Sequence, residues 1–432
     1  MMVCAAAHAE TLTFAETVAL AARSPAVRSA AQNAELARRG RDIDRSPLSL
    51  SLSSGVRGST GSVSNAVEAT ETGVAFDPVT LAATLNVVPV GPNATAAERM
   101  DAAVMIAETA YADVLEDTLL SAVEQHLSAL RNADEERVLR EQVEVARFAL
   151  SGVQARLRAG AAGEAEVLAA QLALAGAESD LATTLREGAE DLGTLTLTLG
   201  VDVGKVQGPV PVGAALEPFD LEAQLGRRGD VRAAILAVRE AELAAADARF
   251  GTLPTGTLGV GYIRSAGGQG VALGASIGSE SGFQPQLSAS YGPYEDDAVT
   301  RGAFSASLGV SITLDPATPA VLDTAALRVT QAQAALDNVR ALARLEVSTR
   351  LRELAAAEAS LGLAARQLEL SARLLAGVRE RFELGLVTPL ELKQAEGAQL
   401  EARLAQDVAQ DAVLLARLRL ARALAFTVQD VL

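Results

Sequence analysis

Large aromatic side chains are scarce in this chain: Phe, Tyr and Trp together make up 3% of the residues, and tryptophan is absent. Alanine and leucine dominate instead, a composition that favours long helices with narrow contacts over a globular core of large side chains. Basic residues form no runs, and the formal net charge is -17. Because phosphate binding depends on clustered Lys and Arg, this balance argues against a nucleic-acid partner.

The residue groupings of an active site are also missing. No Ser/His/Asp or metal-ligand grouping is visible, and His126 stands alone in a polar helical stretch, where we expect it to be solvated. The sequence therefore predicts no enzyme: no catalytic residues, no cofactor and no metal site.

No apolar run approaches the roughly 18 residues of a membrane-spanning helix, so this chain would cross a bilayer only as strands. Residues 1–9 end in Ala7-His8-Ala9, a small-x-small cleavage pattern, and we interpret them as a residual signal peptide. Cys4, the only cysteine, would leave with this segment, and the mature chain would have neither a disulfide nor a thiol site. The alternative, lipid attachment at Cys4, is disfavoured by its neighbours Met1 to Val3.

An internal duplication organises the rest of the chain. One group of residues recurs at an offset of 225 positions; it comprises Leu150, Gly152, Val153, Arg156, Gly160, Glu166 and Ala170 in the first copy. The matching residues are Leu375, Gly377, Val378, Arg381, Gly385, Glu391 and Ala395. A repeat of this length predicts two copies of one structural unit side by side.

We place repeat 1 at residues 10–211 and repeat 2 at residues 212–432, each with a helix, strands, a long helix and a returning helix. Repeat 1 is predicted to contain a first helix within 12–44, strands 48–56 and 80–90, a long helix 94–158 and a returning helix 164–199. Repeat 2 is predicted to contain a helix 216–250, strands within 255–314, a long helix 319–383 and a helix 389–426.

The strands are predicted from period-two alternation, as in the row from Phe304 to Leu314. Residues 53–73 between the first two strands are rich in Gly, Ser and Thr and are predicted to form a loop. The inserted segment 265–302 is either an enlarged external loop or an extra hairpin.

The long helices are predicted to form a coiled coil. Val347, Leu354, Leu361, Leu368, Leu375 and Phe382 repeat at a spacing of seven. Small residues such as Ala357 and Ala364 follow three positions after members of that row, so neighbouring backbones can come close. Leucines of the returning helix from Leu174 to Leu199 are predicted to pack it antiparallel on the long one.

An open sheet edge is not tolerated in hydrocarbon, and a closed barrel needs at least about eight strands. One chain supplies four clear strands, or six if the insert adds a hairpin. The sequence thus predicts a homo-oligomeric tube, part strand and part helix.

Residues 381–392, RFELGLVTPLEL, resemble the helix-turn-helix signature of TolC-type outer membrane efflux proteins, and residues 156–167 resemble a weaker copy of it. The segment from Leu12 to Arg28 is similar to the opening helix of that family, and Arg45-Ser46-Pro47 to its entry into the first strand. The resemblance covers nearly the whole chain in the correct order.

This resemblance implies a mainly α protein with β structure, in which long antiparallel coiled-coil helices form an α-barrel tunnel in the periplasm. Homotrimerisation would complete the tunnel and a transmembrane β-barrel within outer-membrane lipid. It further implies a passive exit duct of a tripartite efflux or type I secretion system, which receives substrate from a periplasmic adaptor and an inner-membrane pump. The alternative is a soluble periplasmic coiled-coil scaffold or adaptor.

By the same resemblance, the adaptor would dock at Ala159, Gly160 and Ala161 and at Leu384, Gly385 and Leu386. A glycine at the centre permits a tight turn and a close backbone approach. The simpler interpretation, compatible with docking, is that Gly160 and Gly385 end their helices in left-handed conformation.

Glu391 matches the aperture aspartate of the family, and Glu166 is its counterpart in repeat 1. Three chains would then place six carboxylates around a cation-favouring mouth. Alternatively, Glu391 belongs to a capping box that begins at Thr388. Where the family has a polar latch of tyrosine, arginine and aspartate, this chain has Phe382, Val387 and Gln394, so we predict closure by apolar packing that includes Phe382.

Overall fold

The computed structural model describes residues 10–44, 48–53, 56–60, 72–76, 79–85, 92–211, 213–214, 219–266, 269–279, 282–291, 301–311 and 316–432. The predicted signal-peptide segment, residues 1–9, lies outside this range. The chain divides into two compact units. The first comprises Met1–Asn33, Glu108–Arg232 and Asp337–Leu432, and the second comprises Ala34–Ala107 and Ala233–Leu336.

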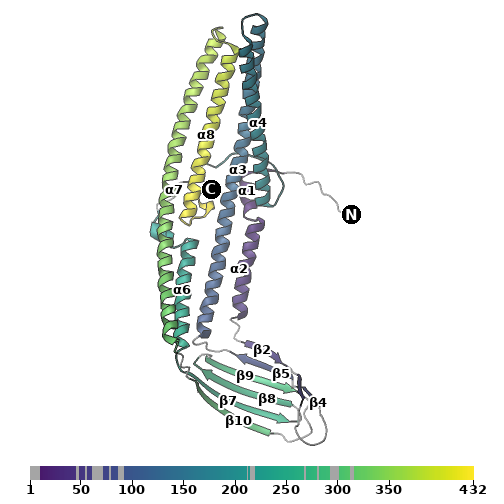
Figure 1. Cartoon of the computed structure of the whole chain (residues 1–432), viewed down its shortest axis with the longest axis vertical. Helices are drawn as coiled ribbons and strands as arrows, with labels where there is room; N and C mark the ends of the chain where they lie inside the picture. The colour runs from purple at the N-terminus through teal and green to yellow at the C-terminus, as the bar shows by residue number, and fades with distance from the viewer. Residues whose placement is uncertain are drawn as a thin grey trace. The chain divides into compact units, whose positions relative to one another are not determined.

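Helices make up most of the described chain (Figure 1). They are α1 (Phe14–Ala21), α2 (Pro25–Asp44), α3 (Pro92–Arg158), α4 (Glu164–Leu199), α5 (Leu221–Leu225), α6 (Gly229–Phe250), α7 (Thr318–Glu383), α8 (Pro389–Ala423) and the short 3-10 helix η1 (Val428–Asp430). The strands are β1 (Glu10–Thr13), β2 (Leu48–Ser53), β3 (Val56–Thr60), β4 (Thr72–Phe76), β5 (Val79–Leu85), β6 (Val203–Gln207), β7 (Thr255–Ala266), β8 (Gln269–Gly278), β9 (Gly282–Tyr291) and β10 (Arg301–Ser311). None of the described helices carries an apolar stretch long enough to cross a bilayer.

The four long helices begin and end close to the predicted residues, whereas both shorter ones are interrupted. The predicted helix 12–44 is split into α1 and α2 before Pro25, and the buried Ser24 accepts a hydrogen bond from the Val27 amide at 3.3 Å. The predicted helix 216–250 is likewise split into α5 and α6. Proline lacks an amide hydrogen and constrains the residue before it, which explains the first break.

Within the first unit, α3 pairs with α4 and α7 pairs with α8, and the connecting turns of the two hairpins lie at the same end (Figure 1). The predicted seam of α7 is confirmed, because Val347 and Leu375 are buried and the other members before Phe382 are at least partly covered. The predicted leucine row of α4 is also covered, except at Leu185, where the neighbouring Thr184 is buried instead.

The hydrophobic core of the first unit lies where the start of the chain meets its end. Strand β1 pairs in parallel with β6, a contact that the sequence did not predict. Leu12, Phe14, Leu119, Leu195 and Leu418 are among the buried residues of this core. Parallel pairing joins strands that are distant in the sequence, and the shared core holds β1 and α1 against the middle of α3 and the C-terminal ends of α4 and α8.

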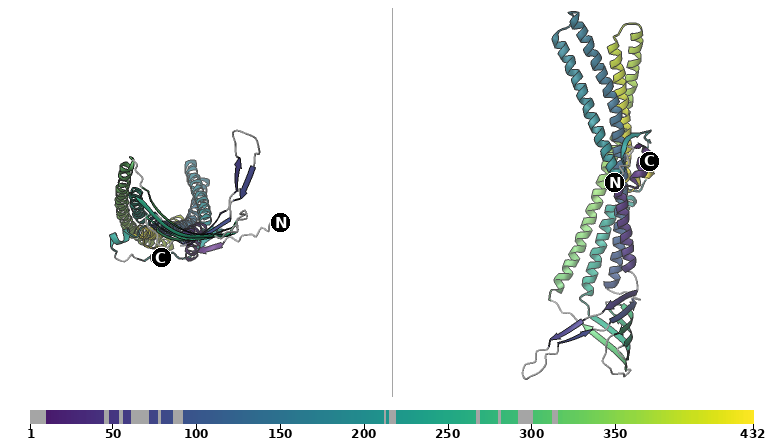
Figure 2. Two further views of the ribbon diagram at one scale, coloured as in Figure 1. Left: turned by 90° about the horizontal axis from the view of Figure 1, so that it is seen from below. Right: turned by 90° about the vertical axis from the view of Figure 1, so that its right-hand side faces the viewer.

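The second unit contains an antiparallel sheet of six strands in the order β10-β7-β8-β9-β5-β2. The sheet is curved (Figure 2). The described part of the insert 265–302 therefore forms a hairpin within the sheet, made by β8 and β9, and the external-loop alternative is wrong for these residues. The predicted loop 53–73 also contains regular structure, since β3 and β4 pair as a separate two-stranded ribbon.

Candidate functional site

The turn between α3 and α4 is a helix end closed by a left-handed glycine. Gly160 has φ +71°, its amide donates to the Leu157 carbonyl at 2.9 Å, and the Ala161 amide donates to the Arg156 carbonyl at 2.8 Å. These two bonds define a Schellman motif, in which a glycine satisfies carbonyls that the helix leaves free. Any L side chain at this φ would be strained.

The turn between α7 and α8 repeats this geometry. Gly385 has the same φ of +71°, its amide donates to the Phe382 carbonyl at 2.9 Å, and the Leu386 amide donates to the Arg381 carbonyl at 2.9 Å. The interpretation that both glycines end their helices in left-handed conformation is confirmed. The duplication read from the sequence therefore extends to individual hydrogen bonds.

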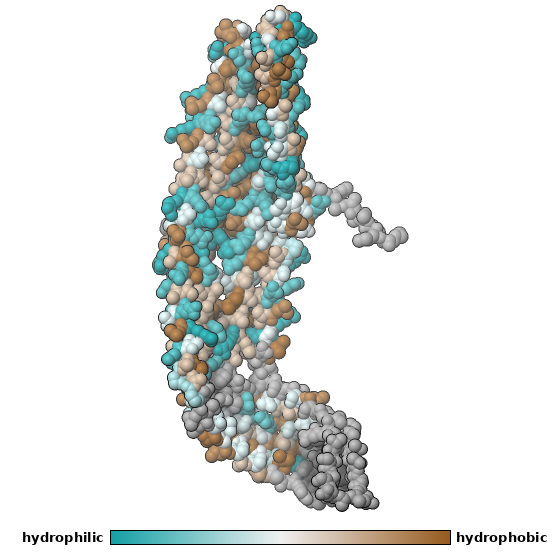
Figure 3. Space-filling model, in the orientation of Figure 1, coloured by the Kyte–Doolittle hydropathy of each residue, from teal (hydrophilic) through white to brown (hydrophobic). Residues whose placement is uncertain are grey.

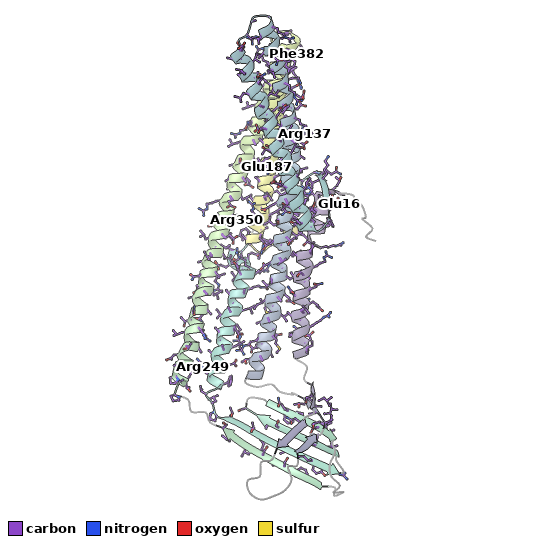
Figure 4. The ribbon with its side chains drawn as sticks, turned by 45° about the vertical axis from the view of Figure 1, so that its right-hand side comes forward. Glu16, Arg137, Glu187, Arg249, Arg350 and Phe382 are labelled. Carbon is purple, nitrogen blue, oxygen red and sulfur yellow. The ribbon has the colours of Figure 1, made fainter. Side chains whose placement is uncertain are left out.

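The residues predicted to bind the adaptor are exposed at both turns. Leu384 and Leu386 are 67% and 66% exposed, although both are large and apolar. Ala159, Gly160 and Ala161 are exposed at the other turn. Phe382, 37% exposed, lies near the end of its hairpin (Figure 4). Clustered apolar side chains that face solvent are typical of a surface that contacts a partner.

Both predicted aperture carboxylates take part in helix capping. The Glu391 carboxylate accepts hydrogen bonds from the Thr388 amide at 2.6 Å and from the Thr388 hydroxyl at 3.2 Å. Glu166 accepts from the Gly163 amide at 3.4 Å and lies 3.4 Å from the Arg156 guanidinium. The predicted capping box is thus present at Glu391, while both carboxylates remain exposed to solvent. One carboxylate can do both tasks, because a capping bond leaves its negative charge in place.

One face of the six-stranded sheet is apolar and uncovered. Phe304, Leu308 and Leu273 are 86%, 79% and 62% exposed. Apolar residues (brown) appear over this part of the molecule in Figure 3. The opposite face, set by the alternating register, carries mainly Ser, Gly, Thr and Gln. An uncovered apolar face of this extent on one side of a sheet suits contact with lipid.

His126 is fully buried, so the expectation that it is solvated is wrong. Its Nδ1 lies 2.8 Å from the Thr17 hydroxyl of α1, and its ring meets that of Phe14 edge to face at 5.5 Å. Burial lowers the pKa of this histidine to about 4. The residues that cover it come from the start of the chain, so its own helix gave no sign of the burial.

Ion pairs between α3 and α8 were not predicted either. Arg131 is hydrogen-bonded to the buried Asp411 and lies 3.0 Å from Asp134 and 3.7 Å from Asp407. Further pairs along the same two helices join Glu124 to Arg419 at 2.6 Å and Asp117 to Arg422 at 2.8 Å. The spacing of seven from Asp117 to Glu124 and Arg131 was the signal in the sequence, since it places all three on one helix face.

No metal site emerges from the described part of the chain, where no three His, Cys, Asp or Glu side chains are grouped so as to hold an ion. The paired helical hairpins with matching turns, and the sheet with one apolar face, are typical of a membrane protein that combines long helices outside the bilayer with strands inside it.

Comparisons with known proteins give the family. The model of the outer membrane efflux protein family matches residues 18–201 and 221–425, and the chain belongs to this family. It is an exit duct of efflux systems and is located in the outer membrane. The family is one of channels and not an enzyme class. Membership of this family rules out the alternative of a soluble periplasmic coiled-coil scaffold or adaptor.

Solved structures share the fold at low sequence identity. The outer membrane channel CmeC of Campylobacter jejuni has a TM-score of 0.68 at 15% identity, covering 96% of this chain and 86% of the other. The outer membrane protein VceC of Vibrio cholerae has a TM-score of 0.67 at 18% identity, covering 96% of each chain. The open state of the MtrE outer membrane channel of Neisseria gonorrhoeae has a TM-score of 0.62 at 19% identity, covering 96% and 90%. No curated protein sequence matches the chain.

Proposed function

We propose that the chain acts as a homotrimer that conducts substrate passively from a periplasmic adaptor and an inner-membrane pump to the cell exterior, in an efflux or type I secretion system. The adaptor docks at the turns around Gly160 and Gly385. The carboxylates of Glu166 and Glu391, with Phe382, form the aperture.

The observation that carries the docking proposal is the equivalence of the two turns. Each has a central glycine at φ +71° with the same pair of backbone hydrogen bonds, and neither glycine has a heavy atom within 4 Å of the position that a Cβ would take. A partner that fits one turn would therefore fit the other. The bare glycine lets a partner backbone approach closely, and Leu384 and Leu386 supply apolar contact.

The sheet supports assembly from several chains. In one chain β10 and β2 are the edges of the six-stranded sheet. Unpaired edges cannot face hydrocarbon, because each free amide or carbonyl costs several kcal/mol there. Pairing of β10 from one chain with β2 of the next removes both edges and generates a closed ring.

The helices support assembly independently of the sheet. Leu363 and Leu370 of α7 are 66% and 64% exposed, and Leu168 and Leu172 of α4 are 64% and 76% exposed. Helix α3 is already joined to α8 within the chain, as the Arg131–Asp411 pair illustrates. The apolar stripes of α4 and α7 would cover each other between neighbouring chains.

A double substitution of Leu384→Asp and Leu386→Asp tests docking apart from pore formation. We expect the variant to form the same oligomer as the parent and to conduct in planar bilayers, but to fail to restore efflux in a strain that lacks the parental gene. Full restoration of efflux would contradict docking at this turn. Loss of both oligomer and conductance would instead show that the turn is needed for assembly, which also contradicts the proposal.

A further inference from the structure

The hairpin of β8 and β9 widens the sheet beyond what the duplication supplies. Each repeat contributes one antiparallel pair, β2 with β5 in the first and β7 with β10 in the second. The hairpin lies between the two pairs, since β8 bonds to β7 and β9 bonds to β5. The two repeats are therefore joined within the sheet only through the inserted strands.

Strand β8 pairs with β7 along almost the whole length of β7. Its register extends without interruption from Ala266 opposite Gln269 to Thr257 opposite Gly278. Beyond the last pair, the Ser279 amide donates to the Gly256 carbonyl at 2.9 Å, and the Gly256 amide donates to the Ser279 hydroxyl at 3.1 Å. The end of β8 thus lies beside the beginning of β7, which follows α6 in the chain, and a loop placed outside the membrane would not return to this point.

The inserted strands carry the same two faces as their neighbours. One register row across the sheet joins Phe304, Tyr262, Leu273 and Leu287, all of them large, apolar and exposed. The next row joins Ser305, Gly261, Gly274 and Gln286, which are small or polar. An insert that formed an aqueous loop would have no reason to keep its apolar residues in register with those of the wall.

The polar face has little room for larger side chains at two of its glycines. A Cβ on Gly259 would meet the Ser307 hydroxyl at 2.7 Å, and a Cβ on Gly309 would meet the Thr257 hydroxyl at 2.8 Å. Side chains converge on the concave side of a curved sheet, so small residues are expected there. These small residues, with the large apolar residues on the other face, assign the Ser/Gly face to the inside of the pore.

We infer that β8 and β9 are wall strands of the outer-membrane pore, so that each chain contributes six strands rather than four. The inference rests on the proposed homotrimer for the total count. Three sheets of six strands give eighteen, whereas three sheets of four would give twelve. Both inserted strands are 10 residues long, and a tilted transmembrane strand needs about 9–11.

A wider wall changes what the exit can select. Because barrel diameter grows roughly linearly with strand number, eighteen strands give about 1.5 times the diameter of twelve. The inner register positions of β7, β8 and β9 include no Asp, Glu, Lys or Arg, and the register of β10 places one charged residue there, Arg301, at the start of the strand. The wider exit therefore admits bulkier cargo, and discrimination by size falls to the helical mouth.

Nitroxide labels on single cysteines test the inference, in a Cys4→Ser background. Leu273→Cys and Ser276→Cys probe the two faces of β8. Leu308→Cys and Ser307→Cys are matched controls on β10, which belongs to the strands that the duplication supplies. For each labelled protein in lipid vesicles, relaxation by dissolved oxygen reports contact with lipid, and relaxation by a water-soluble nickel chelate reports contact with water.

We expect the labels at positions 273 and 308 to favour oxygen by at least about tenfold over those at 276 and 307, which favour the nickel chelate. If the β10 labels alternate but both β8 labels favour nickel, the hairpin is outside the wall and the inference is overturned, while the duct remains. If the β10 labels fail to alternate as well, the proposed function itself is contradicted. Electron microscopy of the trimer then gives the strand count directly.

Discussion

Acidification is expected to loosen helix α1 from α3 through protonation of His126. In the folded chain the Thr17 hydroxyl donates to the Thr13 carbonyl at 3.1 Å and so accepts from the Nδ1–H of His126. The other ring nitrogen, Nε2, is buried without a hydrogen-bond partner. A neutral ring leaves only an acceptor unpaired, whereas a protonated ring would bury a charged donor.

The direction and size of the effect follow from the pKa. Burial lowers the pKa of His126 from 6.5 to about 4. Above pH 6.5 neither the folded nor the unfolded ring binds a proton, so the full stability is present. As the pH falls from 6.5 to 4, only the unfolded state gains the proton, and stability is lost. Between about pH 7.5 and about pH 5, this linkage removes ~2 kcal/mol.

Hydrogen exchange of peptides covering β1 and α1 measures this loss, because local opening is reported by amide protection. After correction for the intrinsic pH dependence of exchange, we expect protection of Phe14–Ala21 to fall about 30-fold between these two pH values. His126→Asn is the matched variant: its amide can still meet Thr17 but does not titrate, so its protection should change little with pH. An equal pH response in the parent and in His126→Asn would show that protonation of His126 does not loosen α1.

Three further predictions concern the mouth and the ion pairs of the first unit. Glu391→Gln retains a capping partner but removes the charge. We therefore expect lower cation selectivity in bilayer reversal potentials, and a thermal unfolding midpoint within about 2 °C of that of the parent. Unchanged selectivity would exclude Glu391 from the aperture. Phe382→Ala is expected to raise single-channel conductance, because a smaller side chain weakens apolar closure, and conductance equal to the parent would count against that closure. Asp411→Ala leaves Arg131 with less buried partners and is expected to cost ~3 kcal/mol in denaturant unfolding. The half-buried Asp407, farther from Arg131, is the matched control, and Asp407→Ala is expected to cost less than ~1 kcal/mol; equal costs would contradict the greater importance of the Arg131–Asp411 pair.

The long helices could be predicted from the sequence because their signals are local. The near absence of Pro and Gly defines α3 and α7, and heptad spacing adds to the signal along α7. Gly160 marks the C-terminal end of α3, and Gly385 marks that of α7. The capping box at Glu391 is also local, since Thr388 and Pro389 precede it. These features are set by neighbouring residues and do not depend on contacts with distant segments of the chain.

What the sequence did not reveal depends on contacts between distant segments. Strand β1 is too short to show alternation, and it is defined by its pairing with β6, almost two hundred residues away. His126 is buried by Thr17 and Phe14, which its own helix cannot indicate. The insert 265–302 showed alternation, but only the register against β7 and β5 distinguishes a wall hairpin from an external loop.

Cross-linking between the sheet edges of neighbouring chains tests whether three chains close the pore. Ser51→Cys on β2 and Ser307→Cys on β10, in a Cys4→Ser background, place one thiol at each edge of the sheet. Treatment of the membrane-embedded protein with a bismaleimide should convert it to a covalent band that ends at three chains, because a closed ring has no further edge to offer. A product that stays monomeric, or a ladder that continues past three, would contradict a trimer sealed through its strands.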